Sequence, residues 1–296
     1  MEIASNENLL KNFYFRKARK HKLRVKFRIM LVLFILPASG IIFFLFFNSS
    51  EYDVAANQRS LLGILFDLVI LVYVLFIYLT RVKQLLPKSS YIELNQENYK
   101  EIWNICYEII EKLDLSKLKL KIYYIKTNDI EAHITLEKGV VHLFLSRALI
   151  SHSHHYPKEL ESILGHEFGH IVQGDSKLFL ITKKAFRLPI FLNDMRLCFG
   201  IFLALFLFFF SSRQVETAVS IIVISLIYRR IYTGFNRLRK ESEFLADLCS
   251  LIIIEKSEII KIVNDYIPES NSPNYPSKKE RLKSIELFKK NIIRNK

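Results

Sequence analysis

The segment L-G-H-E-F-G-H, residues 164–170, holds the side chains that metal-dependent hydrolysis of a peptide bond requires. His166 and His170 are four residues apart, so on a helix they project from one face and can bind one Zn²⁺ at about 2.0–2.1 Å. Glu167 is offset from them by about 100°, where it can take a proton from a zinc-bound water whose pKa is about 7. The segment therefore predicts a hydrolytic zinc site, and the alternative is a surface helix with two solvated histidines.

The surroundings of this segment favour the zinc site over the solvated helix. Pro157 suits the first turn of a helix and Gly174 suits a C-terminal cap, so the segment is expected inside one capped helix. Apolar residues form a separate stripe along this helix, which can anchor it to a core: Leu160, Leu164, Phe168 and Ile171.

A catalytic zinc needs a third protein ligand. All eight histidines lie at or before residue 170, and the extended motif with a further glycine and histidine fails because Gln173 and Ser176 occupy those positions. The third ligand must therefore be acidic or an upstream histidine. The best acidic candidate is Glu243, with Asp247 four residues later on the same helix face to orient a ligand histidine. Spacing alone leaves Glu243 open between a ligand and a solvated carboxylate.

Around this helix the sequence has the patterns of further helices and strands. Helices are expected at residues 97–114, 238–254 and 278–291. Strands are expected at residues 118–125, 131–136 and 140–145. The last two strands flank E-K-G, in which Gly139 can take the left-handed conformation of a hairpin turn. The segment S-H-S-H-H, residues 151–155, is interpreted as a solvated loop rather than a second metal site.

Four hydrophobic runs predict two helical hairpins in a membrane. Residues 29–47 carry no charge over a length that crosses a hydrocarbon core of roughly 30 Å, and residues 60–80 are interrupted only by Asp67. Asp67 lies near the start of its run, so its carboxylate is expected to snorkel towards the interface. The runs 197–212 and 214–228 have about 15 residues each, which leaves open either a second membrane hairpin or a pair of buried or half-inserted helices.

The formal net charge of +14 is concentrated before the first run, where nine basic residues lie between positions 11 and 28. Because this cluster adjoins a span, we interpret it as a cytoplasmic flank rather than a nucleic-acid surface. Three widely spaced cysteines fit a reducing compartment and argue against a disulfide framework. The predicted parts are a basic segment, a hairpin, the first part of a protease domain, a second hairpin and the rest of that domain: residues 1–28, 29–80, 81–196, 197–228 and 229–296.

In this layout the sequence resembles the HtpX and CAAX-prenyl-endopeptidase family of membrane zinc proteases, which are gluzincins. The resemblance covers about residues 30–285 and rests on two hydrophobic spans, H-E-F-G-H, a second hydrophobic pair and E-F-L-A-D. Glu243, Ala246 and Asp247 match the acidic helix of the family, and Gly174 and Asp175 match its G-D after the zinc helix. HtpX-type proteins are the most similar in layout.

The resemblance implies a mostly α membrane protein with two hydrophobic helical hairpins and a cytoplasmic, zincin-like α+β protease domain that contains a small antiparallel sheet. It implies that Glu243 is the third zinc ligand. It also implies an edge strand at Ala132, His133 and Ile134 that pairs with substrate backbone. The implied activity is that of a membrane zinc endopeptidase, with a role in protein quality control as for HtpX-like proteins.

Two positions depart from the family pattern. The family has N-A-F or a similar segment where this chain has E-A-H, residues 131–133. Near the C-terminus, Tyr275 replaces a histidine in N-Y-P-S-K-K-E-R-L. A tyrosine hydroxyl can still donate a hydrogen bond to the scissile carbonyl, so Tyr275 is a candidate catalytic residue.

The sequence therefore predicts an integral, multi-pass membrane protein with one Zn²⁺ per chain, in the inner or plasma membrane if the chain is bacterial. Its N-terminus and catalytic domain are expected in the cytoplasm. The expected partners are the lipid bilayer and an unfolded or membrane-proximal polypeptide, with no nucleic acid. Two alternatives stay open: a catalytically silent scaffold with a structural zinc, which has no need of Glu167, and a membrane-anchored nucleic-acid binder, which leaves the zinc motif unexplained.

Overall fold

The structure is a computed structural model, which describes residues 9–28, 30, 91–174, 212–254, 256–266 and 275–294. The chain divides into two compact units. The first unit contains Met1–Leu23, Gln84–Phe179 and Asn236–Lys296, and the second contains Arg24–Lys83 and Leu180–Phe235. Every candidate site residue lies in the first unit, whose elements are described below.

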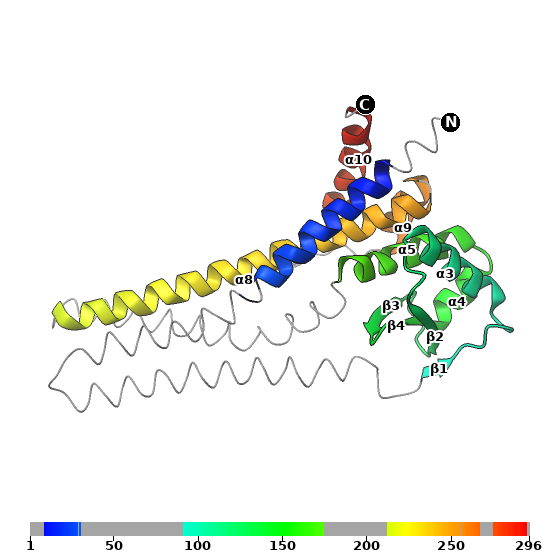
Figure 1. The fold of residues 1–296 in the computed structure, drawn as a ribbon, viewed down its shortest axis with the longest axis horizontal. Helices are drawn as coiled ribbons and strands as arrows, with labels where there is room; N and C mark the ends of the chain where they lie inside the picture. The colour runs from blue at the N-terminus through cyan, green and yellow to red at the C-terminus, as the bar shows by residue number, and fades with distance from the viewer. Residues whose placement is uncertain are drawn as a thin grey trace. The chain divides into compact units, whose positions relative to one another are not determined.

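A four-stranded sheet in the order β1-β2-β4-β3 is the β part of the first unit (Figure 1). Its strands are β1 Tyr91–Glu93, β2 Lys119–Ile125, β3 Ala132–Glu137 and β4 Val140–Ser146. The pairs β1–β2 and β3–β4 are antiparallel, whereas β2 and β4 run parallel. The sheet is therefore mixed, and the prediction of an antiparallel sheet is wrong.

The apolar character of β4 explains this topology. Its sequence is V-V-H-L-F-L-S, and every residue after Val140 is buried, so β4 takes the central place that a near-continuous apolar strand favours. The β3 strand carries the exposed His133 and stays at the edge. Since β4 runs parallel to β2 and antiparallel to β3, the edge strand β3 runs opposite to both of them.

The hairpin between β3 and β4 turns through two residues with left-handed backbone, Lys138 at φ 48° and Gly139 at φ 81°. Positive φ at both central positions is the requirement of the two-residue turn that matches strand twist. The predicted left-handed Gly139 is thus confirmed. The positive φ of Lys138 had no signal in the sequence.

The helix α5, Pro157–Gln173, is the centre of the helical layer. It packs against β3 and against three helices: α3 Lys100–Lys112, α4 Arg147–Ser153 and α9 Lys256–Tyr266 (Figure 1). The predicted apolar stripe of α5 is in the core, where Leu160, Leu164 and Phe168 are at most 1% exposed. Burying each such side chain contributes about 1.5–3 kcal/mol, which fixes the face that α5 turns towards the sheet.

Both predicted ends of α5 are confirmed. Pro157 occupies the first turn, where its missing N–H leaves no hydrogen bond unmade. Gly174 caps the C-terminal end with φ 74°, and its N–H donates to the carbonyl oxygens of His170 and Ile171. The turn that contains His170 is therefore held by a cap directly after it.

The helix α8 runs without a break from Ser212 to Ile253. The fourth hydrophobic run, 214–228, and the predicted helix 238–254 are thus parts of one helix. In the part of the chain that the structure describes, no helix has both the length and the apolar composition of a membrane crossing. The runs 29–47 (apart from Met30), 60–80 and 197–211 lie outside the described residues, as do Asp67 and Asp175.

The interpretation of residues 151–155 as a polar loop is wrong for residues 151–153, because α4 continues to Ser153, whereas residues 154–155 form an exposed turn. Ser146 caps the start of α4 by accepting the N–H of Leu149 at 3.1 Å. His152 Nε2 then lies 2.7 Å from the buried carboxylate of Glu159, which also binds Lys261 of α9 at 2.5 Å. This histidine therefore takes part in a hydrogen-bonded network that ties α4, α5 and α9 together.

Candidate metal centre

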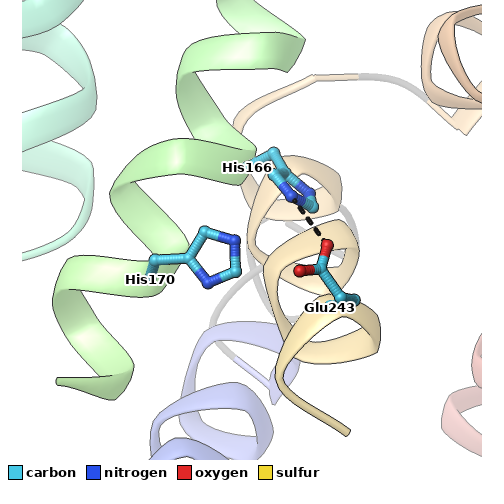
Figure 2. A group of neighbouring side chains, drawn as sticks. All are labelled: His166, His170 and Glu243. Atoms are coloured by element: carbon cyan, nitrogen blue, oxygen red, sulfur yellow. Dashed lines mark ion pairs between the residues drawn. The ribbon is translucent and has the colours of Figure 1, made fainter. Parts of the chain in front are cut away.

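His166 and His170 project from α5 towards Glu243, which α8 carries (Figure 2). The two imidazole rings are nearly perpendicular, with their centroids 4.9 Å apart. Nε2 of His166 lies 3.4 Å from a carboxylate oxygen of Glu243. One donor atom from each of the three side chains lies within 4.8 Å of the other two. Among the described residues, these three form the one cluster of His, Cys, Asp and Glu that could hold a metal ion.

Two glycines of α5 allow α8 to approach this closely. A Cβ atom at Gly169 would lie 2.9 Å from Cβ of Cys249 and 3.0 Å from Cα of Ala246. A Cβ atom at Gly165 would lie 3.1 Å from Cα of Ser250. Real Cβ atoms almost never make contacts this short, so the close approach of the two helices depends on glycine in α5. The absence of a side chain at Gly165 and Gly169, rather than their backbone freedom, allows the two ligand helices to pack together.

Each histidine has its Nδ1 atom engaged by a residue of α8. Nδ1 of His166 lies 3.0 Å from Asp247, and Nδ1 of His170 lies 3.3 Å from the hydroxyl of the buried Ser242. In both rings this leaves Nε2 for a metal. Contacts of this kind fix the tautomer and the orientation of metal-binding imidazoles. Sequence reasoning anticipated Asp247 in this position and missed Ser242, which directly precedes Glu243.

Arg281 completes the surroundings of His166 and was also missed. It lies in α10, Lys278–Arg294, and its Nε donates to Asp247 at 2.8 Å, while Nη2 donates to the other oxygen of that carboxylate. Its guanidinium also lies 3.9 Å from Glu243. Arg281 is 9% exposed, so this charge pairs with carboxylates in a largely dry site.

A capping box fixes the start of the helix that carries Arg281. The hydroxyl of Ser277 accepts the N–H of Glu280 at 3.2 Å, and Glu280 accepts the N–H of Ser277 at 2.7 Å. Lys240 of α8 adds an ion pair to Glu280 at 3.2 Å. The pattern S-K-K-E-R in the sequence is therefore the local signal for this helix start, although it does not tell where Arg281 points.

The charges of the site act on one another. Burial alone would lower the pKa of His166, but its hydrogen bonds with Asp247 and Glu243 raise that pKa to about 9. Burial alone would raise the pKa of Glu243, but the hydrogen bond with His166 and the charge of His170 lower it to about 2. For Asp247, the charge of Arg281 outweighs burial and holds the pKa below its usual range. The site thus keeps two carboxylates ionised, and a proton on His166 would compete with a metal for the same ring.

Glu167 lies next to the cluster and differs from the other carboxylates. Burial raises the pKa of Glu167 to about 7, with opposing effects from the positive charges of His166 and Arg281. The backbone of Ile134 in β3 donates a hydrogen bond to its carboxyl group. A carboxyl group with a pKa near neutrality can accept and return a proton at neutral pH, and a bound cation would favour its ionised form.

The residues expected at the edge strand lie in β3, which is the terminal strand of the sheet. Ile134 is 7% exposed and contacts Glu167, while the His133 side chain is 65% exposed and lies 3.7 Å from Glu131. Ala132 is half-buried. The backbone of the edge strand therefore passes directly beside the candidate base.

Tyr275 lies just before α10, with its ring 3.8 Å from the guanidinium carbon of Arg239. Arg239 precedes Glu243 by one turn of α8. The ring of Tyr275 thus packs against the helix that carries Glu243, through a cation–π contact with Arg239.

The donor set fits zinc. Two ligands of one tetrahedral Zn²⁺ lie roughly 3.4 Å apart, because each bond is about 2.0–2.1 Å long. The separation of His166 and Glu243 already equals this value, and the other pairs are within 4.8 Å. Two histidines and one glutamate are a ligand set of catalytic zinc sites, which keep a fourth position open.

Comparison with known proteins gives the family. The family model described as "Peptidase family M48" matches residues 96–287, well over half of the 296 residues. The match includes both histidines, Glu167, Glu243, Asp247 and Arg281. A search of curated proteins found no match. The chain therefore belongs to peptidase family M48, the family of the HtpX and CAAX-prenyl-protease zinc metalloproteases, and is a metalloprotease that hydrolyses peptide bonds.

Proposed function

We propose that this protease is a membrane-bound endopeptidase with one zinc ion per chain, held by His166, His170 and Glu243. The observation that carries the proposal is the meeting of these three donors within 4.8 Å, with each histidine oriented through its Nδ1 atom. A structural zinc site is normally closed by four protein ligands. A cluster of three donors with an unused carboxyl group beside it fits a catalytic site better.

Glu167 is the proton carrier in this proposal. Bound zinc would polarise the scissile carbonyl and lower the pKa of water to about 7. Glu167 takes the proton of the attacking water as that water adds to the carbonyl carbon, and returns it to the leaving nitrogen as the C–N bond breaks. Asp247 and Arg281 hold His166 in place during both steps.

The β3 strand is proposed to bind the substrate. An edge strand offers unpaired backbone groups to an extended peptide, which gives affinity with loose demands on sequence. At Ala132, His133 and Ile134 such a peptide would pass beside Glu167, because Ile134 already contacts that carboxyl group. This arrangement suits an unfolded or membrane-proximal polypeptide.

Tyr275 is proposed to donate a hydrogen bond to the scissile carbonyl. Replacing Tyr275 by phenylalanine keeps the stacking on Arg239 and removes only the hydroxyl group. We expect a loss of about 10-fold or more in kcat from the missing hydrogen bond, with an unchanged KM. Unchanged kcat in casein hydrolysis would remove Tyr275 from the mechanism.

The membrane part of the proposal is supported by the sequence. The uncharged run 29–47 and the run 60–80 have the length of spans, and basic residues flank both outer ends of this hairpin. These features favour an integral, multi-pass protein with its catalytic domain in the cytoplasm. A role in membrane protein quality control follows from the resemblance to HtpX-like proteins.

Removal of the metal tests the proposed function. The full chain would be extracted from membranes with detergent and purified, and its zinc content and casein hydrolysis measured before and after treatment with a chelator. We expect one zinc ion per chain, complete loss of hydrolysis on chelation, and recovery when Zn²⁺ is returned.

Three results would contradict parts of this proposal. Hydrolysis that persists without zinc would refute the metal mechanism. Stoichiometric zinc without hydrolysis of casein would favour the silent scaffold. Recovery of the chain in the soluble fraction without detergent would refute the membrane location.

A further inference from the structure

The helix at residues 9–28 contributes to the protease core, although it lies outside the segment that the family model matches. It is drawn in blue in Figure 1. Tyr14, Ala18 and His21 are spaced by four and three residues and are at most 2% exposed, so they form one buried face. The opposite face carries exposed basic residues, among them Arg16 and Lys20. The segment interpreted from its charge as a membrane flank therefore also has an inner face that is buried against the rest of the first unit.

Tyr14 connects this helix to both helices of the metal centre. Its hydroxyl donates to the carbonyl oxygen of Gly169 at 3.2 Å, and its side chain shares a hydrogen bond with the thiol of Cys249. Gly169 directly precedes His170 in α5, and Cys249 follows Asp247 by two residues in α8. The contact lies where α5 and α8 pack tightly, since a Cβ at Gly169 would be 2.9 Å from Cβ of Cys249.

Two further contacts lie next to this one. The buried ring of His21 lies 3.7 Å from the carboxylate of Glu241, two residues before Glu243 in α8. The side chain of Lys22 packs against Gly174, which caps α5. The inner face of residues 9–28 thus contacts both ligand helices within a few residues of each proposed ligand.

We infer that Tyr14 is a positioning residue of the metal centre, which holds α5 and α8 in the register that lets His170 and Glu243 bind one ion. The inference rests on the proposed ligand set. His170 and Glu243 lie 73 residues apart in the chain and on different helices, so their alignment depends on contacts between the helices. Metal binding tolerates displacements of only about 0.5 Å. A buried hydroxyl that contacts both helices where they pack tightly restrains such displacements.

Replacing Tyr14 by phenylalanine tests this role, because it removes the hydroxyl and keeps the ring. The full chain in detergent would be freed of metal, and its Zn²⁺ affinity measured by competition with a chelator of known affinity. The visible absorption spectrum of bound Co²⁺ would report the geometry of the site. We expect the Zn²⁺ dissociation constant to rise by about 5- to 10-fold, less than the 10- to 100-fold typical of residues that bond to a ligand directly. The Co²⁺ spectrum should change as well.

The matched control is Asn12→Ala, on the exposed face of the same helix, which should behave as wild type. If Tyr14→Phe lowers the melting temperature but leaves Zn²⁺ affinity and the Co²⁺ spectrum unchanged, Tyr14 supports the fold alone and the inference is wrong. His170→Ala separates the two proposals. If it binds Zn²⁺ as tightly as wild type, the ligand set fails and this inference with it. If it loses Zn²⁺ while Tyr14→Phe does not, only the inference on Tyr14 fails.

Discussion

Replacing Glu167 by glutamine is expected to lower the rate of casein hydrolysis by about 10²- to 10⁴-fold and to leave the zinc content unchanged. The amide cannot take a proton from the attacking water, whereas its size matches that of the carboxyl group. Its oxygen can still accept the hydrogen bond from Ile134. Burial already disfavours the charged form of Glu167, so the neutral amide should not destabilise the folded state.

The measurements are kcat for casein hydrolysis and the zinc content of the same preparation. Glu161→Gln serves as the control, since it makes the same chemical change six residues earlier in α5, outside the metal cluster. It should keep wild-type activity. Activity of Glu167→Gln at the wild-type level would mean that another group accepts the proton, and Glu167 would lose its proposed role.

Replacing Arg281 by methionine is expected to lower the free energy of unfolding by about 3–5 kcal/mol, because it leaves the buried carboxylate of Asp247 without its arginine partner. Asp247 is 3% exposed and receives two hydrogen bonds from Arg281. Methionine fills a similar space, so the loss of stability reports the missing charge of Arg281 rather than a cavity. Because Asp247 also binds Nδ1 of His166, Zn²⁺ affinity should fall by about 10- to 100-fold.

Denaturant unfolding of the metal-free chain measures the free energy of unfolding, and competition with a chelator measures the Zn²⁺ affinity. Lys283→Met is the matched control, an exposed cation two residues later in α10. Combining Arg281→Met with Asp247→Asn should recover part of the lost stability, because the second change removes the unpaired charge. If Arg281→Met lowers the free energy of unfolding no more than Lys283→Met does, the ion pair of Arg281 with Asp247 does not stabilise the fold.

Local features of the fold could be predicted because their signals are local. A proline in the first turn and a glycine after the last turn give both ends of α5, and E-K-G gives the turn between β3 and β4. The position of β4 between β2 and β3 could not be read from strand patterns, because a hairpin can add to a sheet by either of its strands. Its apolar sequence was the available signal, since the more apolar strand is favoured in the middle.

The residues of the candidate site also differ in whether a local sequence signal points to them. The spacing of His166, Glu167 and His170 indicates their shared helix, whereas Glu243 lies 73 residues after His170 and was assigned through a family resemblance. Arg281 lies in a basic helix, in which nothing distinguishes a buried arginine from its solvated neighbours. Tyr14 was hidden for a related reason, since the charges around it suggested a purely solvated segment.

The close contact between α5 and α8 has a consequence for how this sequence can vary. A residue larger than glycine at position 169 would need a smaller one opposite, but its nearest neighbours would be Cβ of Cys249, which every residue except glycine has, and Cα of Ala246, which is backbone. Compensation between the two helices is therefore nearly exhausted at this point. We therefore expect almost no substitution of Gly169 to be tolerated, whereas substitutions on the exposed face of α5 should have little effect.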